Sequence, residues 1–488
     1  MKILFINPII DLDFFYKKNN CNDPSYLNLG ILYLASIALK KNHQVMVKVI
    51  HSSMVKKVIK KFNPDLVCIS CMTPQYSESK KIATIIKKID PNIKTFLGGY
   101  LPTNKYDYIL KESSVFDYLF LGEGEITFEK VLDKIKNKKS IKDIKGLAWK
   151  ENSIIKTTGE GELVKNLDSL IFPARQLVDF KIPEIVISRG CKYNCKFCSI
   201  KEFYKRTYRL RSVDNVIKEI KKLSALDYKM IKISDDNFGL NKEWLNEFTN
   251  KLVKNKLNKL EYQLLTDIKN LNSEGISDFI SKVNVKRIMT GIQTVNEKNA
   301  RAFGLRHDNA SIRKLFKKFE FKNVKLELYY ILNLGGMNET IEDMRNDANK
   351  FYKLISEYKN TKIGIGSILI LELFPGIEIN KEFEKAKIKA SKDWILYQAT
   401  SCNYEMKNYS SKELNDFKLE FRKKFAKYYP PTEKKLFKQS GIAYLITIIR
   451  AKLSFKTRIK ILSFVILNKL FTSKDNPTII KQMLIRFF

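Results

Sequence analysis

The sequence has few of the features that mark fibrous, secreted or membrane-spanning proteins. Glycine (19) and proline (12) are sparse among the 488 residues, and no segment has the composition of collagen or of a low-complexity linker. No run of about 18 uncharged apolar residues occurs, so we predict no transmembrane helix. Met1 and Lys2 lead directly into an apolar segment without the pattern of a secretory signal. We therefore expect a cytoplasmic protein.

Cysteines are few, and acidic residues are outnumbered by basic ones. The seven cysteines are odd in number and unevenly spaced, which argues against a disulfide framework and favours a reducing compartment. The 52 Asp and Glu residues against 89 Lys and Arg give a net charge of +37. Because the lysines are spread over the whole chain, we interpret this charge as compositional, with an anionic partner as the alternative. We do not expect nucleic acid to be that partner.

Short apolar segments alternate with helical patterns in residues 1–140, and apolar strands separated by helices predict a doubly wound parallel sheet. In such sheets ligands bind beyond the carboxyl ends of the strands. Residues 141–183 are predicted to form a hairpin and a connector. The predicted strands of the first region are 3–6, 44–50, 66–70, 95–97 and 118–121.

A second alternating array occupies residues 184–380, and its six strand–helix units predict a partial βα barrel. Residues 381–488 have a helical, basic pattern. The fold class is therefore α/β, with two such regions and a helical C-terminal region. The predicted barrel strands are 184–188, 230–234, 262–266, 287–292, 325–332 and 363–370.

Three cysteines follow the first strand of the predicted barrel. Cys191, Cys195 and Cys198 have the spacing CxxxCxxC, at the end of a strand where barrel chemistry takes place. Three thiolates in a short loop suit an iron–sulfur cluster, and the missing fourth ligand leaves one iron open. The alternatives are weaker, because a structural zinc site prefers four ligands and no His lies near these cysteines.

Segment 188–198 resembles the radical SAM (S-adenosylmethionine) superfamily, which favours an aromatic residue at the position of Phe197. The resemblance implies a 4Fe–4S cluster on the three cysteines, with SAM bound to the fourth iron and cleaved to a 5′-deoxyadenosyl radical. Asp235 and Asp236 have helix capping as their alternative role. The resemblance implies these candidate SAM contacts: Phe197, Ser234, Asp235, Asp236, Thr266 and Gln293, the last standing where relatives often have Glu.

Residues 1–140 resemble the cobalamin-binding domain that precedes many radical SAM barrels, through segments such as Leu97-Gly98-Gly99. The resemblance implies a bound cobalamin, and a retained but empty domain is the alternative. The Asp-x-His-x-x-Gly signature is absent, so we expect no protein histidine on the cobalt. The implied cobalamin contacts are Ser70, Thr73, Gly98, Gly99, Gly122 and Glu123.

These features predict cobalamin-dependent methylation of an unactivated carbon in a small-molecule or lipid substrate. The alternatives are a cobalamin-independent radical rearrangement, cyclisation or oxidation, and a non-enzymatic iron–sulfur electron carrier or nucleic-acid-binding protein. The resemblance implies an electron donor such as flavodoxin or ferredoxin. Apolar stretches at 441–453 and 459–471 are broken by Lys and Arg, and we expect them to cap the barrel or form a substrate lid. The alternative is that they are amphipathic helices in peripheral contact with a membrane. No residue is predicted as a catalytic acid, base or radical relay.

Overall fold

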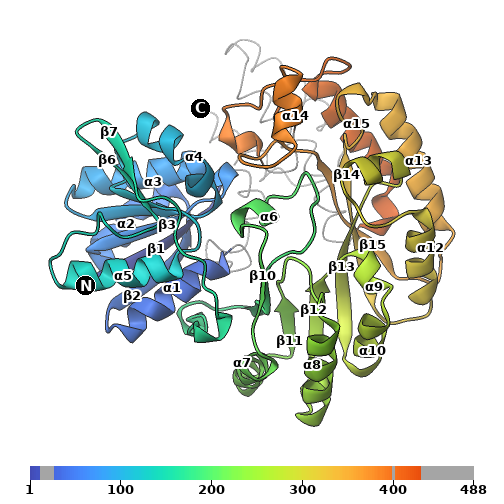
Figure 1. Cartoon of the computed structure of the whole chain (residues 1–488), viewed down its shortest axis with the longest axis horizontal. Coiled ribbons are helices and arrows are strands. Elements are labelled where there is room, and N and C mark those ends of the chain that lie inside the picture. The colour runs from blue at the N-terminus through green and yellow to red at the C-terminus, as the bar shows by residue number, and fades with distance from the viewer. Residues whose placement is uncertain (11–26, 398–401, 430–488) are drawn as a thin grey trace, which may run out of the picture. The chain divides into compact units, whose positions relative to one another are not determined.

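The computed structural model describes residues 1–10, 27–397 and 402–429. These residues form two α/β regions that follow one another along the chain (Figure 1). Within the described residues, no helix is both long enough and apolar enough to cross a membrane.

The N-terminal region is built on a seven-stranded sheet with the order β2-β1-β3-β4-β5-β6-β7. The first five strands in the chain are parallel, and all residues of β3 are buried, as expected for strands covered on both faces. Its strands are β1 Lys2–Pro8, β2 Gln44–Ile50, β3 Leu66–Ser70, β4 Lys94–Gly98, β5 Tyr118–Phe120, β6 Leu147–Glu151 and β7 Ile154–Thr157.

Two separate apolar cores cover the two faces of this sheet. One core contains Leu32 and Phe128, so it is closed by α1 (Leu29–Lys40) and α5 (Glu125–Lys136). The other core packs against helices that together cover the opposite face: α2 Ser52–Phe62, α3 Tyr76–Ile89 and α4 Tyr100–Glu112. The sheet is therefore doubly wound, and the predicted fold class of this region is confirmed.

The predicted hairpin forms the edge of the N-terminal sheet. Strand β6 pairs antiparallel with β5, and β7 pairs antiparallel with β6, so the sheet continues past residue 140. Two single turns of 3-10 helix, Leu167–Ser169 and Arg175–Leu177, lie in the connector that leads to the second region.

The second region is a six-stranded parallel sheet with the order β15-β14-β13-β12-β11-β8, which is the partial barrel predicted from the sequence. Its strands are β8 Glu184–Ile185, β11 Met230–Ile233, β12 Glu261–Leu265, β13 Val285–Gln293, β14 Lys325–Leu332 and β15 Ile363–Ile370. Its helices are α7 Val213–Ala225, α8 Lys242–Lys254, α9 Ile268–Leu271, α10 Glu274–Lys282, α11 Glu297–Ala302, α12 Asn309–Lys318 and α13 Ile341–Ser356.

The first barrel strand differs from the prediction. Residues 184–188 were expected to form one strand, but β8 ends at Ile185 and a second strand, β9 (Ser188–Gly190), pairs antiparallel with β10 (Tyr208–Leu210). The break occurs because the backbone N–H groups of Ile187 and Ser188 donate to the Asp235 carboxylate instead of to a neighbouring strand.

The described part of the C-terminal region packs on the barrel through aromatic rings. Helices α14 (Asn380–Lys385) and α15 (Ser411–Lys424) follow β15. The Phe421 ring of α15 lies 5.2 Å from the ring of Tyr330 on β14. The apolar stretches predicted at 441–453 and 459–471 lie outside the described residues.

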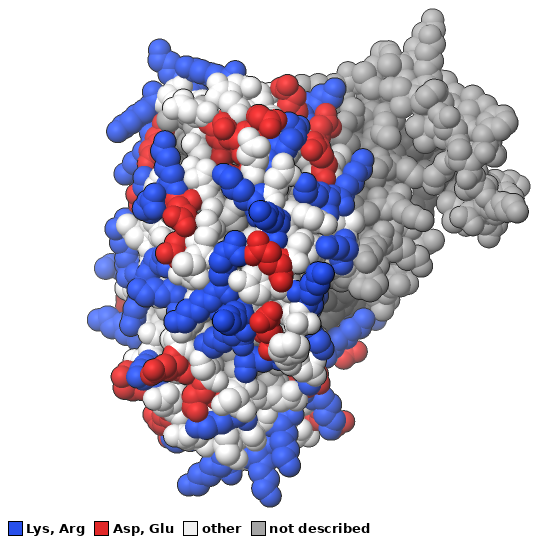
Figure 2. All heavy atoms as spheres, turned by 90° about the vertical axis from the view of Figure 1, so that its right-hand side faces the viewer, with Lys and Arg blue, Asp and Glu red and all other residues white. Residues whose placement is uncertain are grey.

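Basic side chains dominate the face of the barrel region seen in Figure 2, but acidic side chains lie between them. Ion pairs such as Arg313–Glu357, which joins α12 to the residue after α13, illustrate this mixing. The positive charge on this face is therefore spread, as the lysine distribution in the sequence indicated.

Candidate active site between the sheet and the barrel

The cysteine loop, residues 191–198, begins directly after β9 and ends just before the short helix α6 (Ile200–Phe203). Gly190 turns the chain into this loop with a φ of +85°, and a Cβ atom there would lie 2.0 Å from the carbonyl oxygen of Thr207. Only glycine fits this close approach of β9 to β10. The Gly190 N–H donates to Asp236 Oδ2 at 3.1 Å, which joins the loop to the end of β11.

The three thiols of the cysteine loop lie in a poorly solvated environment. Burial raises the pKa of Cys195 to about 12 and that of Cys198 to about 11. The neighbouring cysteines of the loop raise both pKa values further. Burial raises the pKa of Cys191 as well, so thiolates here need compensating positive charge such as bound iron. The described residues contain no group of three His, Cys, Asp or Glu side chains that could share a single ion. A cluster differs, because each thiolate binds its own iron.

Distant segments of the chain hold the cysteine loop in place. The Lys196 N–H donates to the Phe303 carbonyl at 3.2 Å, and the Phe197 ring lies 6.3 Å from the Phe303 ring. The Arg306 guanidinium stacks 3.8 Å from the centre of the Tyr193 ring. The donor set of three thiols, with its backbone fixed by these contacts, fits a cluster that has three protein ligands.

The predicted SAM residues after β11 are close to the cysteine loop but are already engaged with the chain. Asp235 is buried; its Oδ2 accepts from Ser188 Oγ at 2.6 Å, and its Oδ1 accepts from the backbone N–H groups of Ile187 and Ser188. Ser234 Oγ donates to Glu184 Oε2 at 2.8 Å. Burial raises the pKa of both Asp235 and Asp236 to about 6. A SAM contact of Ser234, Asp235 or Asp236 stays a prediction.

Asn237 connects the first cysteine to the end of β12. Its Oδ1 accepts from Thr266 Oγ1 at 2.9 Å and from the Asp267 N–H at 3.1 Å, which fixes the orientation of the amide. Its Nδ2 then donates to Asp267 Oδ2 at 2.7 Å and points at Cys191 Sγ at 3.9 Å. Thr266 is thus placed near the cluster site as part of this network. Sequence reasoning gave Asn237 no role of its own.

Gln293 ends β13 in a left-handed conformation, with a φ of +53°. The register between β13 and β14 shifts between Gly291 and Gln293, so the strand carries an irregularity at this point. The Gln293 side chain folds back over Gly291, where a Cβ atom would lie 1.5 Å from its amide. A contact of Gln293 with SAM stays a prediction.

A cavity of about 470 Å³ lies between the carboxyl ends of the N-terminal strands and the start of the barrel. Five of the six predicted cobalamin residues line it: Ser70, Gly98, Gly99, Gly122 and Glu123. The sixth, Thr73, is buried and is not among the lining residues, whereas its neighbour Met72 is. On the barrel side the cavity is lined by Ser188, Arg189, Ser199 and Ser234, among others. The cavity therefore reaches both flanks of the cysteine loop.

Gly99 shapes the wall of this cavity. Its φ is +120°, and a Cβ atom would lie 2.8 Å from the Cys71 carbonyl oxygen. Any side chain at this position would strain the turn after β4 and crowd the lining. A glycine-lined cavity at the carboxyl edge of a doubly wound sheet fits a large planar cofactor with a nucleotide tail.

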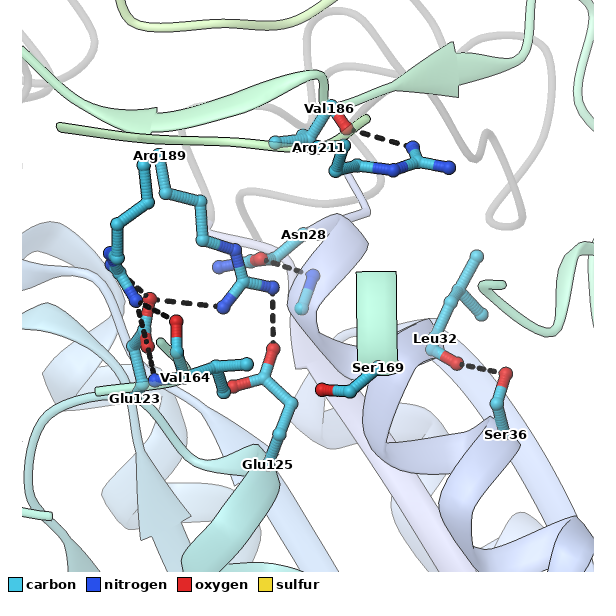
Figure 3. Close-up of polar contacts among 12 residues, drawn as sticks. Asn28, Leu32, Ser36, Glu123, Glu125, Val164, Ser169, Val186, Arg189 and Arg211 are labelled. Carbon is cyan, nitrogen blue, oxygen red and sulfur yellow. Dashed lines mark hydrogen bonds and ion pairs between the residues drawn. The ribbon is translucent and has the colours of Figure 1, made fainter. Parts of the chain in front are cut away.

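Three buried charged residues and one that is partly buried join the two regions, and we call them the acid–arginine cluster: the buried Glu123, Glu125 and Arg189, and the partly buried Arg209. Figure 3 shows Arg189 reaching Glu123 and Glu125 from the barrel side. Sequence reasoning assigned no role to the two arginines or to Glu125. A signal was present, because Arg189 follows a strand predicted to be buried and an arginine in such a place needs an acidic partner.

A doubly wound sheet, a partial barrel and three cysteines after the first barrel strand define the class of radical SAM proteins with an N-terminal ligand-binding domain. The family model of the B12 binding domain matches residues 23–132, and that of the radical SAM superfamily matches residues 185–351. Residues 185–351 thus match the radical SAM superfamily and residues 23–132 the B12 binding domain, as the resemblances in the sequence predicted. The two families imply cobalamin, SAM and a 4Fe–4S cluster as cofactors.

A relative among the curated proteins matches part of the chain. An uncharacterized methyltransferase of Pyrococcus horikoshii is 33% identical over 232 residues, which is 44% of this chain and 50% of that protein. The chain thus spans about half of that relative's length.

Two solved structures share the fold. The radical SAM methyltransferase TsrM from Kitasatospora setae, with cobalamin and a [4Fe-4S] cluster bound, has a TM-score of 0.61 at 17% identity and covers 79% of this chain and 75% of its own. The cobalamin-dependent SAM radical enzyme OxsB has a TM-score of 0.66 at 13% identity, and the match covers 96% of this chain and 71% of OxsB. These likenesses confirm the predicted fold.

Proposed function

We propose that the protein is a radical SAM enzyme that uses cobalamin to methylate an unactivated carbon of a small-molecule or lipid substrate. One observation carries this proposal: a single cavity is lined both by the glycine-rich edge of the B12-type sheet and by residues on either side of the cysteine loop. A methyl carrier held by the sheet and a radical generated at the barrel would thus act on one substrate between them.

Cys191, Cys195 and Cys198 would hold the 4Fe–4S cluster, and Asn237 would donate toward the sulfur of Cys191. When bound, the cluster and SAM supply a 5′-deoxyadenosyl radical, and cobalamin supplies a carrier for the methyl group. The aromatic side chains of Tyr33, Phe120 and Tyr204 line the cavity and would help to exclude water from reactive species.

Ser70, Gly98, Gly99 and Gly122 would receive the cobalamin, with the glycine backbone in close approach to it. A protein histidine on the cobalt is not part of this proposal, because the Asp-x-His-x-x-Gly signature is absent from the sequence.

We also propose an electron-donor partner and a location for the protein. An electron donor such as flavodoxin or ferredoxin would reduce the cluster, and the net charge of +37 suits an acidic protein of that kind. A cytoplasmic protein with peripheral membrane contact through 441–453 and 459–471 would suit a lipid substrate, and these stretches lie outside the described residues.

Anaerobic reconstitution of the full chain tests the cluster. The wild type should take up iron and sulfide and convert SAM to 5′-deoxyadenosine in the presence of dithionite. The Cys191→Ala/Cys195→Ala/Cys198→Ala variant should lose both, whereas Cys402→Ala, which removes a buried cysteine outside the loop, should keep both. Iron and sulfide retained by the triple variant would contradict the proposal.

The cobalamin part has a separate readout. The wild type, incubated with hydroxocobalamin and passed over a gel-filtration column, should elute with the corrin absorption spectrum. SAM cleavage without retained cobalamin would favour a cobalamin-independent radical reaction instead.

A further inference from the structure

Three members of the acid–arginine cluster, Glu123, Glu125 and Arg189, line the cavity. Arg189 is two residues before Cys191 in the same chain segment. Glu123 lies in the turn after β5, and Glu125 is the first residue of α5. The acid–arginine cluster therefore joins the B12-type sheet to β9, the strand that leads into the cysteine loop.

The geometry of β9 and β10 explains why two arginines meet at this point. Arg189 and Arg209 are directly paired in the antiparallel register, so their side chains lie on the same face of the ribbon. Like charges in such a pair repel each other unless an acid lies between them. Glu123 has that role, because its Oε1 lies 3.0 Å from Arg189 Nη1 and 2.8 Å from Arg209 Nη2.

The contacts of each acid are specific and well protected from water. Glu123 Oε2 accepts from Arg209 Nη1 at 2.9 Å and from the Val164 N–H at 2.7 Å. Glu125 Oε1 accepts from Arg189 Nη2 at 2.6 Å, and the Arg189 guanidinium lies 5.2 Å from the centre of the Tyr33 ring. The side chains of Arg189 and Glu123 are only 9% and 3% exposed.

The four charges depend on one another. The buried guanidinium of Arg189 has two acidic partners, because Glu125 Oε1 lies 2.6 Å from its Nη2 and Glu123 Oε1 lies 3.0 Å from its Nη1. Burial works against the Glu123 carboxylate, and Arg209 and Arg189 reverse this and lower its pKa. Removing or displacing one member leaves a buried charge without its partner, which is costly. The acid–arginine cluster is therefore a rigid link between the B12-type sheet and the β9–β10 ribbon.

We propose that Arg189 couples the occupancy of the cavity to the position of the cysteine loop, so that cobalamin and the iron–sulfur cluster affect each other's binding. The coupling rests on the proposed function. A ligand in the cavity that contacts Glu123, Glu125 or Arg189 shifts the position of Gly190 and Cys191. In return, a 4Fe–4S cluster bound to the cysteine loop fixes the position of Arg189. Arg189 is a positioning residue, because it acts through the loop backbone.

The affinity for hydroxocobalamin, measured by absorption titration of the full chain with and without the reconstituted cluster, tests this coupling. The ratio of the two dissociation constants should be about fivefold or more in the wild type. It should fall below about twofold in Glu125→Gln, which keeps the shape of the acid, and in Arg189→Lys, which keeps the charge but not the fork of donors. A residue with only a structural role would change both constants equally and leave the ratio intact.

Glu160→Gln is the matched control, because Glu160 and Lys205 form an exposed ion pair, with 3.1 Å between them, that joins the same two regions. This variant should keep the wild-type ratio. Two results would overturn the coupling and leave the proposed function standing. The first is a ratio near one in the wild type. The second is a ratio in Glu125→Gln and Arg189→Lys that equals that of the wild type. A wild type that binds no hydroxocobalamin in either state would remove the cobalamin function itself, and the coupling with it.

Discussion

The carboxylate of Asp235 links the end of β11 to the strand that leads into the cysteine loop. In Asp235→Ala, the N–H groups of Ile187 and Ser188 and the Ser188 hydroxyl lose their acceptor in a buried environment. Each such unsatisfied donor costs about 1–3 kcal/mol, so three give about 3 kcal/mol at the low end. For a cooperative unit of the size of the radical SAM domain, this lowers Tm by about 6–12 °C.

Asp235→Asn should behave very differently. The amide oxygen can still accept from both N–H groups, and the amide nitrogen can donate to Ser188 Oγ. Because burial raises the pKa of Asp235 to about 6, the ionised carboxyl lowers the stability of the folded state at neutral pH by about 3 kcal/mol, relative to a carboxyl that keeps its unfolded pKa. The neutral amide avoids that cost, so we expect the Tm of Asp235→Asn at pH 7.5 to equal or exceed that of the wild type.

The same shift gives a pH dependence with a defined sign. The unfolded carboxyl ionises near pH 4, whereas the folded one holds its proton until about pH 6. The folded state thus binds more protons in this window, and the contribution of Asp235 to stability falls as the pH rises from about 4 to about 6. Asp235→Asn should lack this part of the slope.

Scanning calorimetry of the cofactor-free proteins at pH 5 and pH 7.5 measures both effects. A wild-type Tm in Asp235→Ala, or an equally low Tm in both variants, would refute the structural role of the carboxylate. Titration of SAM into the reconstituted Asp235→Asn variant tests the other role: weaker SAM binding at an unchanged Tm would support the SAM contact predicted from the sequence.

Three further substitutions have defined outcomes. Asn237→Leu removes the amide directed at Cys191 Sγ and should lower the midpoint potential of the cluster in an EPR-monitored redox titration; an unchanged potential would contradict this contact. Gly99→Ala should weaken hydroxocobalamin binding about tenfold or more, because its Cβ would lie 2.8 Å from the Cys71 carbonyl oxygen. Its control, Gly275→Ala, should bind hydroxocobalamin normally, because the new Cβ would make an ordinary contact at 3.6 Å. Lys205→Ala removes an exposed ion pair and should change the unfolding free energy by less than about 0.5 kcal/mol; a larger loss would contradict its solvated character.

The sequence by itself determined the order of the elements and predicted the chemistry of the cysteine loop. Apolar runs alternating with helical periodicity were enough to predict both sheets, because strands buried on two faces need apolar residues at nearly every position. The spacing of Cys191, Cys195 and Cys198 indicated a cluster without any tertiary information, because all three ligands come from one short loop. Gly98, Gly99 and Gly122 could be placed at the cavity because each lies at or just after the end of a strand of the sheet.

Only the tertiary structure decided which residues meet across long distances in the chain. Asp235 ends β8 early although it lies 48 residues beyond Ile187, and Arg189 pairs with Glu123 from 66 residues away. Asn237 received its orientation from Thr266 and Asp267, which follow the next barrel strand, β12. A sequence pattern records what each residue needs, such as an acid for a buried arginine. Which partner meets that need depends on how the strands and helices pack, and packing brings together residues whose separation in the chain carries no signal.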